Sequence, residues 1–512
     1  MKKTLLFLGL LGFAGHAQAQ APWTLVNTPN SEMFSQYNVV EINTLSQNLA
    51  WAVTQARVAT GQPAAIPNTC LVTKNSAGAG DEFAFNSVSV TPTATVGNIS
   101  GVDANIALAS GYPGSTYTGP GATVGTTPGT YGGEIVKTIN GGASWTRKTT
   151  ATQFFGAGTF CNWVHMFNAT TGVALGDPPT AGGGFEILRT TDGGETWSAV
   201  SGVPSPLADE YGNAGAFFAS ASAPGTLWTG LASSVSTNTV RVLKTTDFGA
   251  TWTVSNRIPN IVGAVSQLAF KSNNLEGIAY GFTIVGTAPN TSIGAVNLAK
   301  TTDGGRSWTA VTPNNDATGN FYRNSIDAVG NVFYSTGARF GATPATQVAA
   351  DFGTSFSTDG VNWTTINLSG TTLEEPGYFF RMDLIGAPTA SSPNRVVGHG
   401  GLYTDVNGVG GVYKFERTIT ATRNSALQST LGVYPNPSAS GVFKVDLGSE
   451  LKAGAQLTVV DALGRQVASQ TLNATTIGSK TVNLDLSAEK TGVYTLQIRT
   501  NAGIATQKLV IE

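Results

Sequence analysis

The chain of 512 residues has few charged side chains. Asp, Glu, Lys and Arg together make up 11% of it, against roughly 25% in an average soluble domain. The 28 Lys and Arg residues are balanced by 30 Asp and Glu residues. The sequence therefore lacks the excess of basic residues with which proteins bind nucleic acid or anionic membranes. We expect neutral or polar partners, and no nucleic acid among them.

Long apolar runs are also missing, apart from one short segment at the start. Lys2 and Lys3 precede an apolar stretch from Thr4 to Gly15, and Ala17-Gln18-Ala19 follows as a small-residue cleavage site. This order predicts a signal peptide over residues 1–19. Because no later run approaches about 20 apolar residues, we expect no transmembrane span. The sequence thus predicts an exported protein.

Cysteine and histidine are scarce. The two cysteines, Cys70 and Cys161, have no further Cys or His at metal-ligand spacing, so we predict neither a metal site nor a cofactor. Export permits a disulfide between them, and two free buried thiols are the alternative. Only His165 and His399 follow the signal peptide, and no Ser/His/Asp constellation, phosphate loop or calcium loop is visible.

What the sequence does contain is a repeat. A short segment with an acid or amide, glycine and a final tryptophan occurs five times, and its tryptophans are 52 to 56 residues apart. The copies are Thr138–Trp145 (TINGGASW), Thr190–Trp197 (TTDGGETW), Thr245–Trp252 (TTDFGATW), Thr301–Trp308 (TTDGGRSW) and Ser357–Trp363 (STDGVNW). Such regular spacing predicts one structural unit for each copy.

Each unit has the pattern of a four-stranded antiparallel sheet, in which the repeated segment is the turn before the last strand. Sheets of this size at a spacing of about 50 residues predict an all-β fold with a single β-propeller. Seven units fit between Trp23 and Arg417. Six remain possible, because residues 55–135 are rich in Gly, Thr, Pro and Ala and could be one unit with a long insertion. Trp23–Asn27 resembles Trp252–Asn256, so we expect it to complete the last sheet and close the ring.

The repeated segment resembles the Asp-box, or bacterial neuraminidase repeat, of sialidases, sortilin-type receptors, xyloglucanases and photosystem II assembly-factor propellers. The resemblance covers about three quarters of the chain and implies a propeller. A carboxylate in such a turn can cap backbone N–H groups, and Asn140 can do the same in place of an aspartate. We therefore expect a structural role for the motif residues, which are Asn140, Trp145, Asp192, Trp197, Asp247, Trp252, Asp303, Trp308, Asp359 and Trp363.

The pattern changes near the C-terminus, where short strands predict a small β-sandwich. Four segments resemble the type A C-terminal sorting domain of the Bacteroidetes type IX secretion system: Val433–Pro437 (VYPNP), Asp461–Arg465 (DALGR), Gly492–Arg499 (GVYTLQIR) and Gln507–Ile511 (QKLVI). We assign residues 20–419 to the propeller, 420–430 to a linker and 431–512 to an Ig-like sorting domain. The resemblance implies export by the type IX machinery and its sortase, followed by release or attachment at the outer-membrane surface.

Residues for catalysis are harder to identify. Glycoside hydrolysis needs two carboxyl groups on either side of the bond. The candidates lie in expected loops or beside glycines, and each could instead be a solvated residue or a turn cap: Asp177, Asp209, Glu210, Glu374, Glu375 and His399. His165 lies in an apolar strand and is expected in the core or lining a channel. Arg257-Ile-Pro259 matches a sialidase motif but follows the third copy of the repeat, and we treat it as a coincidence.

These observations favour an exported glycan- or protein-binding propeller over an enzyme. A polysaccharide-active glycoside hydrolase or lyase is the alternative. A structural or assembly role is a third possibility.

Overall fold

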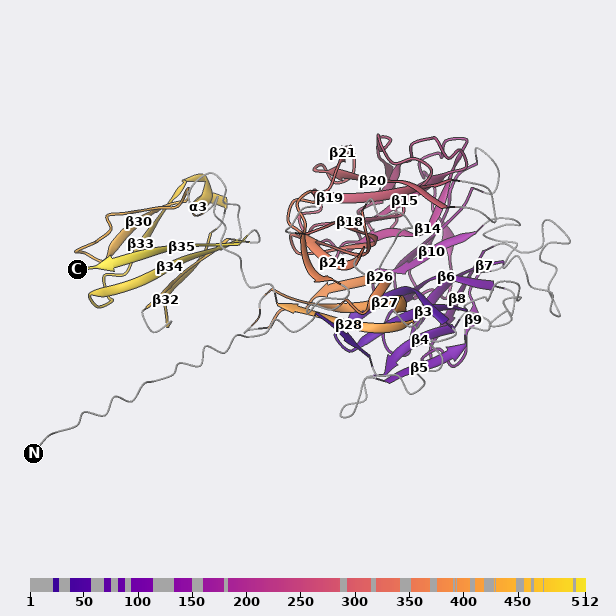
Figure 1. Cartoon of the computed structure of the whole chain (residues 1–512), viewed down its shortest axis with the longest axis horizontal. Helices are drawn as coiled ribbons and strands as arrows, with labels where there is room; N and C mark the ends of the chain where they lie inside the picture. Colours follow the sequence, from indigo (N-terminus) through magenta and orange to yellow (C-terminus); the bar gives the residue numbers. More distant parts are fainter. Residues whose placement is uncertain are drawn as a thin grey trace, which may run out of the picture.

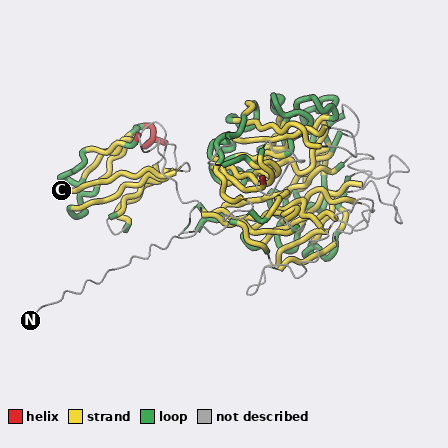
Figure 2. Tube along the Cα trace, viewed as in Figure 1, coloured by secondary structure: helices red, strands yellow, loops and turns green. Residues whose placement is uncertain are grey.

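We analysed a computed structural model of the chain. It describes residues 22–26, 37–56, 69–74, 82–87, 94–113, 133–149, 160–178, 183–285, 292–314, 319–340, 351–368, 375–389, 392, 394–405, 410–418, 428, 430–447, 455–461, 465–472, 474–500 and 503–512. Strands dominate these residues, as Figures 1 and 2 show. The predicted signal peptide and most of the predicted linker lie outside the described residues, so their assignment stays a prediction.

The described residues before Gly432 form seven antiparallel sheets of four strands each, which we number 1 to 7 along the chain. Sheet 1 contains β2 (Tyr37–Ser46), β3 (Leu49–Ala56), β4 (Thr69–Lys74) and β5 (Glu82–Ser87). Sheet 2 contains β6 (Ala94–Gly101), β7 (Ala107–Pro113), β8 (Glu134–Thr138) and β9 (Thr146–Arg147). Sheet 3 contains β10 (Cys161–Met166), β11 (Gly172–Gly176), β12 (Glu186–Thr190) and β13 (Ser198–Ala199).

Sheet 4 contains β14 (Glu210–Ala219), β15 (Leu227–Ser233), β16 (Val242–Thr245) and β17 (Thr253–Val254). Sheet 5 contains β18 (Gln267–Phe270), β19 (Gly277–Val285), β20 (Ser292–Thr301) and β21 (Thr309–Val311). Sheet 6 contains β22 (Tyr322–Val329), β23 (Val332–Arg339), β24 (Phe352–Ser357) and β25 (Thr364–Leu368). Sheet 7 contains β26 (Gly377–Gly386), β27 (Arg395–Asp405), β28 (Gly411–Thr418) and, as its fourth strand, β1 (Trp23–Leu25).

The sheets are arranged in a ring. The first strands contact one another in the order β2, β6, β10, β14, β18, β22 and β26, and β26 returns to contact β2. The N-terminal strand β1 pairs antiparallel with β28, with Trp23 opposite Phe415. The prediction that this segment completes the last sheet is thereby confirmed. Residues 55–135, for which one unit with a long insertion was the alternative, supply strands to both sheet 1 and sheet 2.

Apolar cores lie between successive sheets. One core joins Trp51 of sheet 1 to Ile99 and Trp145 of sheet 2. Another joins Tyr334 of sheet 6 to Phe379 of sheet 7, and the N-terminal Trp23 belongs to it. Each sheet therefore buries its two faces against its neighbours, and the hydrophobic effect stabilises the ring as a whole.

The repeated segments form the turns between the third and fourth strands. In the second copy, the Asp192 carboxylate accepts hydrogen bonds from the Thr196 N–H (2.9 Å) and the Thr190 hydroxyl (2.8 Å). Gly193 and Gly194 have φ of 76° and 83°, where a side chain would be strained. The Trp197 indole N–H donates to the Gly194 carbonyl at 3.2 Å. Because the carboxylate is used within its own turn, its geometry is that of a cap.

Replacing the capping aspartate tests this role. Asp192→Ala is expected to lower the free energy of unfolding by about 1–2 kcal/mol, since it removes a cap of backbone N–H groups. Asp192→Asn is expected to cost clearly less, because Asn140 Oδ1 accepts the Ser144 N–H at 2.9 Å in the first copy. Urea unfolding of both variants gives the comparison. Equal losses for Ala and Asn would show that the charge itself is needed.

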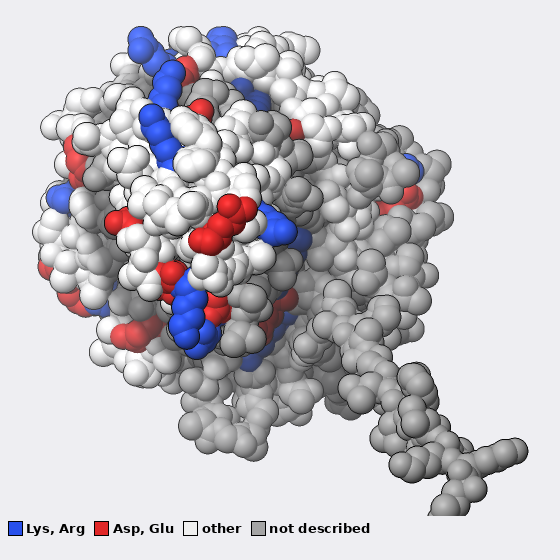
Figure 3. Space-filling model, turned by 90° about the vertical axis from the view of Figure 1, so that its left-hand side faces the viewer, with Lys and Arg blue, Asp and Glu red and all other residues white. Residues whose placement is uncertain are grey.

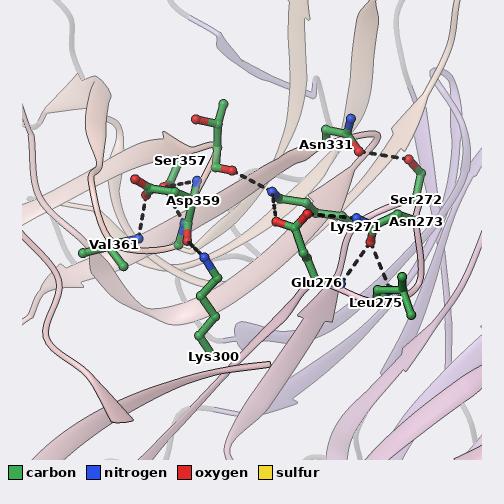
Figure 4. Close-up of polar contacts among 12 residues, drawn as sticks. Lys271, Ser272, Asn273, Leu275, Glu276, Lys300, Asn331, Ser357, Asp359 and Val361 are labelled. Atoms are coloured by element: carbon green, nitrogen blue, oxygen red, sulfur yellow. Dashed lines mark hydrogen bonds and ion pairs between the residues drawn. The ribbon is translucent and has the colours of Figure 1, made fainter. Parts of the chain in front are cut away.

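The residue before four of these turns has a function that the sequence analysis missed. It is Lys or Arg in each case, and its side chain donates to the turn of the next sheet. The bonds run from Lys137 Nζ to Glu195 (2.6 Å), from Arg189 Nε to the Phe248 carbonyl (2.9 Å), from Lys244 Nζ to the Gly304 carbonyl (3.3 Å) and from Lys300 Nζ to the Asp359 carbonyl (2.6 Å). Figure 4 shows the last of them, beside Lys271 and its contact with Glu276. Neighbouring sheets are thus joined by polar bonds as well as by their cores.

The C-terminal residues form two further sheets around one core. The first consists of β29 (Gly432–Tyr434), β30 (Val442–Asp446) and β33 (Thr481–Asp485). The second consists of β31 (Ala455–Val460), β32 (Gln466–Leu472), β34 (Gly492–Thr500) and β35 (Gly503–Ile511), and α3 (Ala474–Gly478) precedes β33. Phe443 of the first sheet and Leu457 and Leu496 of the second share the core. Two sheets packed face to face are what the short-strand pattern predicted.

Candidate functional site

A cavity of about 470 Å³ lies at the centre of the ring. All seven first strands contribute to its wall, together with the turns that follow three of them. Its lining includes Glu41, Asn43, Asn98, Ser100, His165, Gly215, Phe217, Phe218, Gln267, Asp327, Arg381 and Asp383. The volume falls within the range of about 300–1,000 Å³ that is usual for small-molecule sites.

Most polar side chains of this wall bond to the backbone of the neighbouring sheet. Asn43 Oδ1 accepts the Gly101 N–H at 2.8 Å, and Asn98 Oδ1 accepts the Val164 N–H at 2.9 Å. Three further bonds of the same kind follow around the ring: Met166 N–H to Ser100 Oγ (2.9 Å), Ile326 N–H to Gln267 Oε1 (2.7 Å) and Met382 N–H to Ser325 Oγ (2.9 Å). The first strands of adjacent sheets do not pair with each other through their backbones. Their N–H groups that face the interior of the ring are therefore bonded by these side chains instead.

Two carboxyl groups belong to the same belt of bonds. Asp327 accepts the Leu384 N–H (2.6 Å) and the Ala328 N–H (2.7 Å), and Asp383 accepts the Thr44 N–H. Burial raises the pKa of Asp327 well above its ordinary value, and the Asp383 carboxylate raises it further. Burial likewise raises the pKa of Asp383, to about 7. Both carboxyl groups accept hydrogen bonds from backbone N–H groups, as the Asn and Ser side chains do at the corresponding positions elsewhere in the ring.

An ion pair joins sheet 7 to the adjacent sheet 1 at the interior of the ring. Arg381 Nε of sheet 7 lies 3.3 Å from Glu41 Oε2 of sheet 1, and both side chains are largely buried. They lie against Gly215 of sheet 4, on the opposite side, where φ is 69° and the strand register shifts. A Cβ at Gly215 would come within 2.6 Å of Arg381 Nη2. Burial raises the pKa of Glu41, and the Arg381 charge partly offsets this.

His165 of β10 lines the cavity, which is one of the two positions expected for it, the core being the other. Its ring contacts Phe167 and Phe217, with centroids 4.9 and 5.6 Å away. Burial lowers the pKa of His165 to about 4, so the imidazole is neutral at physiological pH. Within the part of the chain that the structure describes, His165 forms no hydrogen bond.

The predicted catalytic residues do not meet in this cavity. Asp177 accepts hydrogen bonds from Asn162 Nδ2 (2.7 Å) and the Gly212 N–H (3.0 Å), and burial raises its pKa. Asp209 accepts hydrogen bonds from Ser233 and Asn238, and hydrogen bonding lowers its pKa. Glu210 forms a buried ion pair with Arg241. These three residues hold loops and the starts of strands through these contacts, and none of them lines the central cavity.

Two other candidates are buried rather than exposed in loops. Glu375 is 3% exposed and accepts the Thr354 hydroxyl at 2.9 Å, while Glu374 lies outside the described residues. His399 is fully buried in β27, with Nδ1 3.2 Å from Thr44 Oγ1. Both lie in sequences rich in glycine or turn residues, which suggested exposure, but the contacts between sheets cover them.

The disulfide that two cysteines permitted is not formed. Cys161 is a free, buried thiol, and burial raises its pKa well above the ordinary value. The topology explains this, because Cys161 begins sheet 3 whereas Cys70 belongs to the third strand of sheet 1. Sheet 2 lies between them in the ring.

Charged side chains of both signs are scattered among uncharged residues over the face of the molecule that Figure 3 draws. Among the described residues, no helix is long and apolar enough to cross a membrane. In the same residues, no group of three or more His, Cys, Asp or Glu side chains could hold a metal ion.

Comparison with known proteins assigns the C-terminal part. Residues 432–512 match the family described as a secretion system C-terminal sorting domain. This domain directs type IX secretion to the cell surface or the extracellular space. No curated protein matches the chain.

Several solved structures are similar over much of the chain. A GH74 enzyme of Niastella koreensis is 14% identical with a TM-score of 0.42, and the match covers 96% of this chain and 74% of the enzyme. A protein of unknown function from Dyadobacter fermentans is 10% identical with a TM-score of 0.41, covering 77% of this chain and 97% of that one. PorZ, a surface component of the type-IX secretion system of Porphyromonas gingivalis, is 11% identical with a TM-score of 0.26, covering 93% and 81%.

Proposed function

We propose that the chain is an exported seven-bladed Asp-box β-propeller that binds a glycan or protein ligand at the centre of its ring. The seven four-stranded sheets and the closed order of their first strands support seven blades. The five repeated turns, with their capping carboxylate or amide, support the Asp-box assignment. Residues 20–419 would be the binding domain, and residues 431–512 would carry it through the type IX machinery to its sortase.

One observation favours binding over catalysis. The cavity is large enough for a ligand, yet Asp327 and Asp383 accept backbone N–H groups of neighbouring strands. A general acid or base must reach the proton that it transfers, and a hydrolase needs two such carboxyl groups flanking the bond. Carboxyl groups engaged in holding the ring together are poorly placed for either task.

The test is a glycan array combined with product analysis, using the purified full chain. We expect glycans to be retained without new reducing ends and without the ultraviolet absorbance of an unsaturated sugar. Released fragments that increase with protein concentration would overturn the proposal in favour of a hydrolase or lyase. Failure to retain any glycan would overturn glycan binding.

A further inference from the structure

We infer that His165 is the ligand-contacting residue of the central cavity, and that its ligand is a neutral sugar unit. The sugar hydroxyls would bond to the imidazole edge while its C–H face packs against Phe217. This inference rests on the proposed binding function, which it deepens by naming a contact and a ligand class.

The first argument is hydrogen-bonding capacity. A neutral imidazole has one N–H donor and one nitrogen acceptor, and the half-buried His165 side chain uses neither within the described residues. His165 lines the cavity, and among the described residues its only ring contacts are with Phe167 and Phe217. A ligand in the cavity could satisfy both nitrogens.

The second argument is that the neighbouring polar groups are already used. Asn98 and Ser100, which precede His165 around the ring, accept the Val164 and Met166 N–H groups on either side of it. The N–H groups of the residues before and after His165 are thus already bonded. The His165 side chain is not needed to bond the backbone of a neighbouring strand. Across the cavity, the Gln267 oxygen accepts the Ile326 N–H, which leaves its amide NH₂ as an additional donor.

The third argument concerns the class of ligand. The Arg381 charge is compensated by Glu41, and Lys271 is compensated by Glu276. Asp327 and Asp383 add acidic groups to the wall, so an anionic ligand gains no unpaired cation there. A hydroxyl both donates and accepts, as a neutral imidazole requires, and the apolar face of a sugar suits the neighbouring aromatic ring of Phe217.

Ligand-observed saturation-transfer NMR on the full chain tests the inference. The probes are the methyl glycosides of glucose, galactose, mannose and xylose, with glucuronate as the charged comparison. We expect at least one neutral glycoside to bind in preference to glucuronate. His165→Phe, which keeps a ring but removes both hydrogen bonds, should weaken its binding at least tenfold. His165→Gln, which keeps a donor and an acceptor, should retain part of it.

The control is Tyr211→Phe, which changes a partly exposed side chain outside the cavity lining and should bind as the wild type does. Circular dichroism verifies that each variant is folded. Unchanged binding by a folded His165→Phe variant, or a preference for glucuronate, would overturn the inference while leaving glycan binding intact. A chain that retains glycans on the array but binds none of these glycosides overturns it as well. If the array itself retains nothing, it is the proposed glycan binding that fails.

Discussion

Replacing Trp23 by alanine is expected to lower the free energy of unfolding by about 3–5 kcal/mol, the usual cost of removing a buried aromatic side chain. Trp23 is 6% exposed and stacks on Phe379 with ring centroids 4.2 Å apart. Its indole N–H donates to Thr354 Oγ1 of sheet 6 at 2.9 Å. The side chain therefore joins the strand that completes sheet 7 to the neighbouring sheet. Urea unfolding followed by tryptophan-independent circular dichroism measures the loss.

The matched control lies two residues away on the same strand. Leu25 is 53% exposed, so Leu25→Ala should change the stability by no more than about 0.5 kcal/mol. Similar losses for both variants would show that β1 contributes through its backbone pairing with β28 and not through the Trp23 side chain.

Glu375→Gln is expected to stabilise the protein above pH 8. Burial raises the pKa of Glu375 from 4.5 to about 8, and no basic side chain is among the causes that act on it. A raised pKa means that the folded state holds a proton that the unfolded state releases, so wild-type stability falls as the pH rises from about 4.5 to about 8. Such a shift corresponds to roughly 5 kcal/mol. Glutamine keeps the shape and the acceptor oxygen without the charge.

The comparison is made by measuring the free energy of unfolding of both proteins at several pH values. The two should differ little near pH 4, and the variant should gain progressively up to about pH 8. Glu416→Gln serves as the control, because the Glu416 side chain is 52% exposed, and its curve should run parallel to that of the wild type. A gain for Glu375→Gln that does not vary with pH would contradict the assignment of a buried, titrating carboxyl group.

Local patterns in the sequence predicted the strands and turns well. The repeated turns depend on contacts within eight residues, such as that between Asp192 and Thr196, so their motif is visible in the sequence. The pairing of β1 with β28 was predicted from the likeness between Trp23–Asn27 and Trp252–Asn256. The sequence also placed His165 in a strand that could line a channel.

The rest of the candidate site could not be predicted, because its contacts join residues far apart in the chain. Arg381 meets Glu41 of the adjacent sheet 1 and Gly215 of sheet 4 across the ring, and no motif marks any of the three. Glu375 was assigned to an exposed loop for the same reason. The strands that bury it are distant in the sequence, so its burial could not be foreseen. One signal was available and unused: each first strand carries a polar residue among apolar ones, as Asn98 and Asp327 do.

The pairing of β1 with β28 also determines an order in which the ring is assembled. Trp23 lies opposite Phe415, so their contact closes a loop of about 390 residues, whereas neighbouring strands pair over short turns. During synthesis Trp23 is made first, yet its partner strand is made only after six other sheets. Until β1 returns, β28 is an open edge able to pair with another chain. β1 is thus synthesised before the other strands of the ring but pairs only after β28 has formed. Between these two events the ring is most open to pairing with a wrong strand.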